Sequence, residues 1–184
     1  MAGSLYSVVW QRALFSRHEC SQLVAAASDW TPALVTADDG SSPATNGRKH
    51  GSWALVPLSP AHEWIYARLA CFLSERASFG FELEEIGSPL KIQRYQVGDF
   101  HGWHADLGAV DGQNRKVGIS VQLSASRNYE GGDLRFFDPP QHRAGPRERG
   151  CAIGFPSYLP HEVTPVTAGT RLALTGWVTG PRFR

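Results

Sequence analysis

Short β-like runs fill the second half of the sequence and limit the folds that this chain can adopt. From about residue 90 onward, apolar and β-branched residues recur in brief segments, separated by turn-rich stretches such as DGQN and YEGG. The runs are KIQRYQV (91–97), VGISVQLS (117–124), DLRFF (133–137), CAIGF (151–155), HEVTPV (161–166) and TRLALTGWV (170–178). About six strands at this spacing are typical of a β-sandwich or barrel, so an antiparallel double sheet is predicted.

Two helices are predicted before these strands. Residues 16–30 begin with Ser16 and carry Glu19 three positions later, which is the pattern of a capping box. Residues 60–80 begin with a proline at a first helical position, and their apolar residues recur at helical spacing up to a terminal glycine. The predicted fold class is therefore mainly β (α+β), with N-terminal helices packed on one sheet.

A polar segment separates the two predicted helices. Residues 36–49 combine Gly, Ser, Pro, Asp and Asn and contain no large apolar residue. This composition predicts an exposed, mobile loop, which serves either as a lid or as an inert connection.

Length, charge and cysteine content restrict the class of protein. With 184 residues and 42% hydrophobic content, the chain suffices for one domain with a sizeable core. A net charge of +1 offers no strong field for nucleic acid or anionic lipid, so neither partner is predicted. Three widely spaced cysteines without a CxxC pair indicate neither a disulfide framework nor a structural zinc site. Because the first fifteen residues also lack a signal-peptide pattern, a soluble cytoplasmic protein is expected.

The stretch HGWHAD (101–106) carries the first candidate metal ligands. On an extended strand residues i and i+2 share a face, so His104 and Asp106 can reach one ion while Ala105 points away. An imidazole and a carboxylate need one further ligand to form the facial triad of a non-heme Fe(II) oxygenase. His161, in PHEVTPV, is the best third ligand.

The segment after His161 adds a candidate cosubstrate anchor. A turn at 167–169 would pair residue 161 with 175 and residue 165 with 171, which would place His161 and Arg171 on one face. An arginine buried there needs an anion, because an unpaired interior charge is costly. A dicarboxylate that chelates iron at one end could present its far carboxylate to Arg171.

The ordered set HxD, EGGxL, HEV and TRxAxTxW resembles the double-stranded β-helix core (a jelly-roll, cupin-like fold) of the 2-oxoglutarate/Fe(II)-dependent dioxygenases, specifically the prolyl 4-hydroxylase-like branch. The resemblance covers residues 89–180, and the preceding part, about 1–88, would supply the supporting helices of a single domain spanning 1–184. It implies Fe(II) as the metal, 2-oxoglutarate and O2 as cosubstrates, and ascorbate as an optional reductant.

The resemblance also assigns roles to particular residues. His104, Asp106 and His161 would bind Fe(II), and Arg171 would bind the distal carboxylate of 2-oxoglutarate. Tyr95 matches a tyrosine that hydrogen-bonds the same cosubstrate, and Trp177 matches a tryptophan that lines the pocket. Gln122 stands in the cosubstrate region where animal oxygen-sensing prolyl hydroxylases tend to have a tyrosine, which weighs against unusually tight cosubstrate binding.

Simpler structural roles compete with these assignments. Arg171 could instead pair with an acid such as Glu162 or Asp133, and Tyr95 could be only a core aromatic residue with a satisfied hydroxyl. Trp177 would act by shape and by excluding water. His101 lies three residues before His104 and would face the other side of an ideal strand. The exposed-type histidines are expected to be solvated, namely His18, His50, His62 and His142. The Gly131–Gly132 pair is better explained by a tight turn than by phosphate binding, because no helix follows it.

The predicted function is a hydroxylase of an aliphatic C–H bond, on a prolyl or other amino-acid side chain of a peptide or protein. A free amino acid or a natural-product intermediate is the alternative substrate. Two alternatives lie outside this enzyme class. One is a non-catalytic metal-binding β-helix module, and the other is a cupin-like zinc or manganese protein that uses no keto acid.

Overall fold

The computed structural model describes residues 8–33, 49–76, 79–80, 82–107, 109–110, 113–138, 140 and 142–181. The helices are α1 (Arg17–Ala26), α2 (Glu63–Arg76) and the 3-10 helix η1 (Ser126–Asn128). The strands are β1 (Val9–Gln11), β2 (Thr31–Pro32), β3 (Ser52–Val56), β4 (Leu90–Tyr95), β5 (His101–His104), β6 (Ala109–Val110), β7 (Gln113–Gln122), β8 (Tyr129–Gly131), β9 (Leu134–Phe136), β10 (Arg143–Ala144), β11 (Ala152–Pro156), β12 (His161–Val163), β13 (Val166–Gly169) and β14 (Arg171–Gly180).

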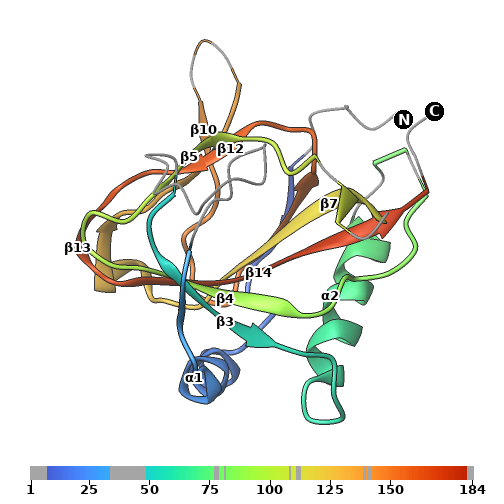
Figure 1. The fold of residues 1–184 in the computed structure, drawn as a ribbon, viewed down its shortest axis with the longest axis horizontal. Coiled ribbons are helices and arrows are strands. Elements are labelled where there is room, and N and C mark those ends of the chain that lie inside the picture. The colour runs from blue at the N-terminus through green and yellow to red at the C-terminus, as the bar shows by residue number, and fades with distance from the viewer. Residues whose placement is uncertain are drawn as a thin grey trace.

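Two antiparallel sheets form the core of the fold (Figure 1). The major sheet has the order β1-β11-β7-β14-β4-β3-β2, with β6 paired to β7. The minor sheet has the order β10-β9-β12-β5, and β13 and β8 form a separate pair. The predicted double-stranded β-helix is therefore confirmed.

Each face of the major sheet has its own hydrophobic cluster. On one face, side chains of α1 and α2 pack against apolar residues of the central strands, which include Ile92, Val121 and Leu174. On the other face, Tyr95 and Phe155 pack with residues of β9 and β12 in the minor sheet. The alternation of side chains along β4 explains this division, because Ile92 points to the helices while Gln93 and Tyr95 face the space between the sheets.

The helices follow the sequence prediction with shorter limits. Ser16 caps α1, and its hydroxyl accepts a hydrogen bond from the Glu19 backbone amide while the Glu19 carboxylate accepts one from the Ser16 amide. The predicted capping box is thus confirmed. α2 begins at Glu63 rather than Pro60, because the preceding residues form a turn in which the His62 and Glu63 amides both donate to the Ser59 carbonyl.

Strand pairing differs from the predicted hairpin. The segment 161–166 does not pair with 171–175. Instead it divides into β12, which joins β5 and β9, and β13, which pairs with β8, whereas β14 lies between β7 and β4 in the other sheet. Pairing partners depend on contacts distant in sequence, which a local turn signal does not specify.

The N-terminal part contributes strands as well as helices. β3 pairs with β4, and β1 pairs with β11, so both extend the major sheet beyond the core predicted from residue 89 onward. Of the predicted 36–49 loop, only Lys49 falls within the described residues. None of the described helices is long and apolar enough to cross a membrane.

Candidate metal and cosubstrate site

Three predicted ligands meet between the sheets. His104 ends β5, His161 begins β12, and the register of the two strands places them directly opposite each other. Asp106 lies just beyond β5, where its backbone amide donates to the Ser157 carbonyl at 2.8 Å. The potential ligand atoms of the three side chains lie within 4.8 Å of one another, and Asp106 carboxylate oxygens are 3.7 Å from His104 Nε2 and 3.5 Å from His161 Nε2.

The hydrogen bonds of both histidines leave Nε2 available as a ligand. His104 Nδ1 lies 2.7 Å from the Gly102 carbonyl, and His161 Nδ1 lies 2.9 Å from the Leu159 carbonyl. Because a carbonyl oxygen only accepts, each Nδ1 carries the proton and each Nε2 has a free lone pair directed toward Asp106. Backbone carbonyls commonly orient metal-binding histidines in this way. The residues therefore fit a divalent metal ion.

Burial keeps His104 neutral. Desolvation, reinforced by the nearby His161, lowers the pKa of His104 to about 4, although the Asp106 carboxylate partly opposes the shift. Since a metal binds the neutral imidazole, the site does not have to lose a proton from His104 at neutral pH before it binds an ion.

We expect the metal-free protein to lose stability as the pH falls from 6.5 toward 4. A histidine in the unfolded chain titrates near 6.5, whereas the folded pKa of His104 is about 4. The unfolded state binds more protons within this window, so acidification favours unfolding. Melting temperatures of metal-free protein between pH 7.5 and 5 would measure the effect. His104→Gln should flatten the curve relative to the exposed control His18→Gln, and equal slopes would contradict the assignment.

His101 was wrongly predicted to face away from the site. β5 and β12 change register between the pairs His161–His104 and Val163–His101, so the strand is irregular there. This irregularity turns the His101 ring onto His104, with ring centroids 3.6 Å apart and 19° between planes. His101 lines the same cavity as the triad. Burial, together with the repulsion that a protonated His104 would exert, lowers the pKa of His101 to about 2. His101 therefore supports the His104 ring by stacking on it in the neutral form.

Arg171 lies in the same cavity as the triad, and its guanidinium is buried with the whole residue only 2% exposed. The acids proposed as alternative partners are occupied elsewhere, because Glu162 pairs with Arg135 and Asp133 pairs with Arg147. Among the described residues no carboxylate pairs with Arg171, and its Nε has no hydrogen-bond partner. A buried guanidinium in this state is suited to an incoming carboxylate.

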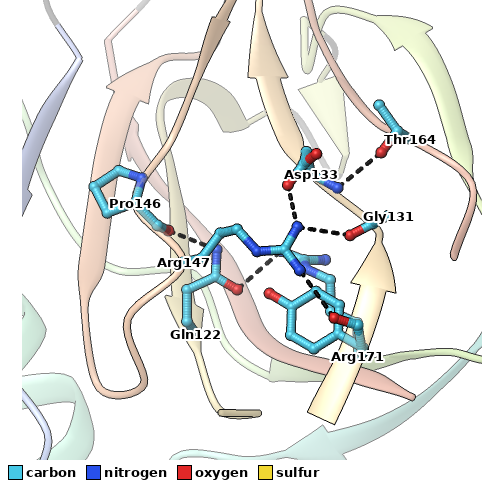
Figure 2. A network of polar contacts seen from close by, with 8 residues as sticks. Gln122, Gly131, Asp133, Pro146, Arg147, Thr164 and Arg171 are labelled. Atoms are coloured by element: carbon cyan, nitrogen blue, oxygen red, sulfur yellow. Dashed lines mark hydrogen bonds and ion pairs between the residues drawn. The ribbon is translucent and has the colours of Figure 1, made fainter. Parts of the chain in front are cut away.

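Gln122 contacts Arg171 rather than the cavity (Figure 2). Its Oε1 accepts a hydrogen bond from Arg171 Nη2 at 3.2 Å, while its Nε2 donates to the Pro146 carbonyl at 3.2 Å. The next residue, Arg147, donates to the Tyr129 and Gly131 carbonyls. Gln122 thus holds the Arg171 guanidinium from outside the cavity. It can therefore influence a cosubstrate only through Arg171 and not by direct contact.

The Gly131–Gly132 turn supports the same arginine. Both glycines have positive φ, at +66° and +60°, which confirms a tight turn. A Cβ atom on Gly132 would lie 3.1 Å from Arg171 Cδ, and one on Gly131 would clash with the Pro165 carbonyl oxygen. The EGG part of the sequence motif therefore permits the backbone to approach the arginine closely.

The sequence resemblance implies 2-oxoglutarate as the cosubstrate. Replacing Gln122 by leucine should weaken its binding about tenfold, because a buried guanidinium loses a hydrogen bond that holds its orientation. The KM for 2-oxoglutarate should rise while kcat at saturation changes little, since Gln122 does not line the cavity. Gln96→Leu, at an exposed position after β4, is the matched control. A wild-type KM in the Gln122 variant would show that Arg171 needs no such support.

Tyr95 and Trp177 both line the cavity. Arg171 lies 5.5 Å from the centre of the Tyr95 ring, directly across the β4–β14 pairing. Burial raises the pKa of Tyr95 to about 12, so its hydroxyl stays protonated and can donate a hydrogen bond. The Arg115 guanidinium stacks on Trp177 at 3.8 Å, which fixes the indole as a wall of the cavity.

Comparison with known proteins places this geometry in a family. The model of the 2OG-Fe(II) oxygenase superfamily matches residues 90–179, the stretch that contains the triad and Arg171. Residues 90–179 therefore form a core of the 2OG-Fe(II) oxygenase superfamily type. This superfamily uses Fe(II), 2-oxoglutarate and O2, and the His-Asp-His set present here fits its metal.

Relatives of this 2OG-Fe(II) oxygenase domain include PKHD-type hydroxylases. One from Idiomarina loihiensis is 37% identical over 87 residues, which cover 47% of this chain and 40% of the relative. One from Gloeothece citriformis is 37% identical over 92 residues, which cover 48% of this chain and 41% of the relative. The matched region thus spans about two fifths of the length of these curated relatives.

Solved structures share the fold of this chain over nearly its whole length. A prolyl-4-hydroxylase from Pseudomonas putida superposes with a TM-score of 0.69 at 21% identity, covering 96% of this chain and 94% of the other. A prolyl hydroxylase from Trichoplax adhaerens, in complex with a hypoxia-inducible-factor peptide, gives a TM-score of 0.70 at 17% identity, covering 95% and 83%. The fold is therefore that of the prolyl hydroxylase-like members.

Proposed function

We propose that this chain is a 2-oxoglutarate- and Fe(II)-dependent dioxygenase that hydroxylates an aliphatic C–H bond of a prolyl or other amino-acid side chain in a peptide or protein. The observation that carries the proposal is the presence of two complementary sites in one cavity. The first is the triad of His104, Asp106 and His161, and the second is a buried Arg171 without a carboxylate partner among the described residues.

The roles of the side chains follow from their positions. His104, Asp106 and His161 would hold the metal through two Nε2 atoms and a carboxylate, which leaves coordination positions open. When bound, Fe(II) with 2-oxoglutarate supplies oxidation of a C–H bond coupled to decarboxylation of the keto acid. Arg171 would bind the distal carboxylate in a bidentate pair, and the protonated Tyr95 hydroxyl would donate to the same cosubstrate.

Residues around the cavity would control water and orientation. Trp177, held by the Arg115 guanidinium, forms an apolar wall that excludes solvent from the reacting bond. Gln122 keeps Arg171 oriented without touching the cosubstrate. Placement of this kind reduces the entropy cost of aligning metal, cosubstrate and substrate.

The choice of a prolyl or similar side chain is supported by the relatives alone. PKHD-type hydroxylases match the core, and solved prolyl hydroxylases match the fold. The near-neutral charge of the chain favours a peptide or small-molecule partner over nucleic acid. We place the protein in the cytoplasm, which is supported by three unpaired cysteines.

Anaerobic titration with Fe(II) and then 2-oxoglutarate tests the proposed function first. A metal-to-ligand charge-transfer band that appears only after 2-oxoglutarate would support chelation of the keto acid. Succinate formation in air should then increase when proline-containing peptides are added. Bound iron without the band would instead support the cupin-like alternative. The band without succinate across a broad panel would support the non-catalytic module.

A further inference from the structure

A group of cations lies on the cavity side of the major sheet. Lys49 lines the cavity together with the triad. Lys91 is two residues before Gln93 on β4, and Gln93 also lines the cavity, so both share that face. Arg115 of β7 stacks on the cavity-lining Trp177. The strands that carry Lys91, Trp177 and Arg115 are adjacent, in the order β4, β14, β7 (Figure 1).

Aromatic rings hold two of these cations in place. The Lys91 ammonium lies 4.6 Å from the centre of the Trp53 ring, and the Arg115 guanidinium lies 3.8 Å from that of Trp177. Trp53 pairs with Gln93 across β3 and β4, so its ring belongs to the same face. Cation–π contacts of this kind restrain a charged group but do not neutralise it.

The positive charges lie close enough to act on one another. Burial, and then the charge of Lys91, lowers the pKa of Lys49 to about 8. Burial, and then the charge of Arg115, lowers the pKa of Lys91. Lys49 still remains largely protonated at neutral pH. Repulsion between partly buried like charges destabilises a protein unless an anion binds beside them.

Among the described residues, Asp106 is the acid whose charge acts on these cations, and it partly opposes the lowering of the Lys49 and Arg115 pKa values. None of the carboxylates of the described residues forms an ion pair with Lys49, Lys91 or Arg115, and Asp106 is the only one of these acids that lines the cavity. A bound divalent metal and 2-oxoglutarate carry opposite double charges, and Arg171 balances Asp106. The three other cations would therefore still lack a counter-charge in the loaded site.

We propose that Lys49, Lys91 and Arg115 form a subsite for a carboxylate of the substrate, so that the oxidised residue carries an acidic group beside it. The inference rests on the proposed function, which makes the substrate a peptide or an amino acid. The anionic groups of unmodified peptides and amino acids are carboxylates. The carboxylate belongs either to an acidic side chain next to the reacting residue of a peptide, or to the α-carboxyl group of a free amino acid.

Binding of matched probes to the Mn(II)- and 2-oxoglutarate-loaded protein tests the subsite. The peptide pair is N-acetyl-Gly-Pro-Asp-Gly amide and its asparagine counterpart, and the small pair is N-acetylproline and its amide. Quenching of tryptophan fluorescence reports binding, since Trp53 and Trp177 face the site. We expect the carboxylate member of one pair to bind at least about tenfold more tightly. The pair that shows the preference identifies the source of the carboxylate.

Charge-removing variants locate the preference. Lys49→Met and Lys91→Met should each reduce the ratio of carboxylate to amide affinity toward one, whereas Arg127→Met, an exposed cation outside the cavity, should leave it unchanged. The ratio is measured within one variant, so a partly unfolded fraction cancels. Lys49→Glu should acquire a preference for a lysine-containing peptide over the aspartate one, which a folding defect cannot produce.

The outcomes separate this proposal from the proposed function. If 2-oxoglutarate binds but no carboxylate probe is preferred to its amide, the subsite is wrong and the proposed function stands. If 2-oxoglutarate does not bind, the proposed function is wrong, and the ratios in the Lys49 and Lys91 variants still decide the subsite. A preference that survives both lysine substitutions would also overturn the subsite.

Discussion

Replacing Asp106 by alanine abolishes iron-dependent formation of succinate, with an expected loss of at least about a thousandfold. Asp106 is the only anionic member of the triad, and its two oxygens face the Nε2 atoms of His104 and His161 at 3.7 and 3.5 Å. Without the carboxylate, only two neutral imidazoles remain. They bind a divalent ion more weakly, and the third protein ligand that fixes the coordination geometry of the ion is missing.

Two measurements separate loss of metal from loss of fold in the Asp106 variant. Isothermal titration with Mn(II) should show a large drop in affinity, while the circular dichroism melt should remain cooperative. Asp138→Ala is the matched control, because Asp138 pairs with Arg143 at an exposed position. Retained succinate formation in metal-defined assays by Asp106→Ala would overturn the triad.

Local patterns in the sequence predicted much of the fold. The capping box of α1 depends on two residues three positions apart, and it forms as expected. The alternation in KIQRYQV likewise divides β4 between the helix-facing Ile92 and the cavity-facing Tyr95. Each of these features is determined within a single element, so the sequence of that element is enough to predict it.

Features that depend on strand pairing could not be predicted in the same way. The placement of His161, Arg171 and Trp177 in one cavity agrees with the prediction, but the hairpin that was used to derive it does not form. The two segments lie in opposite sheets that face each other, which brings the side chains together by a different route. His101 enters the cavity because β5 and β12 shift register, and such a shift depends on both strands.

No pattern in the sequence predicted that Lys49 lines the cavity. It follows a polar stretch that carries no periodicity, so nothing marked it as different from the lysines of a solvated loop. Its place in the cavity follows from an isolated bridge to His101, a contact between residues 52 positions apart. Long-range contacts of this kind bring together most of the candidate substrate subsite, whereas the triad and Arg171 lie in short recognisable motifs.

Substitution of Arg171 by methionine should raise the KM for 2-oxoglutarate by at least about a hundredfold. Methionine roughly preserves the buried volume, but the charge-assisted bidentate pair with the distal carboxylate is lost, and such pairs contribute several kcal/mol in a buried site. The rate at saturating 2-oxoglutarate should fall far less, because the triad that holds the metal is intact. Steady-state kinetics over a wide range of 2-oxoglutarate concentrations would measure both effects.

The conservative variant Arg171→Lys distinguishes cosubstrate binding from a structural role. An ammonium keeps the charge but cannot form the two parallel hydrogen bonds of a guanidinium, so its KM should lie between those of the wild type and Arg171→Met. The exposed substitution Arg143→Met should leave the KM unchanged. If Arg171→Met instead lowers the melting temperature and leaves the KM of the folded protein at its wild-type value, then Arg171 stabilises the sheet. In that case the carboxylate of 2-oxoglutarate must be bound by another cation of the cavity, and Lys49 is the first to test.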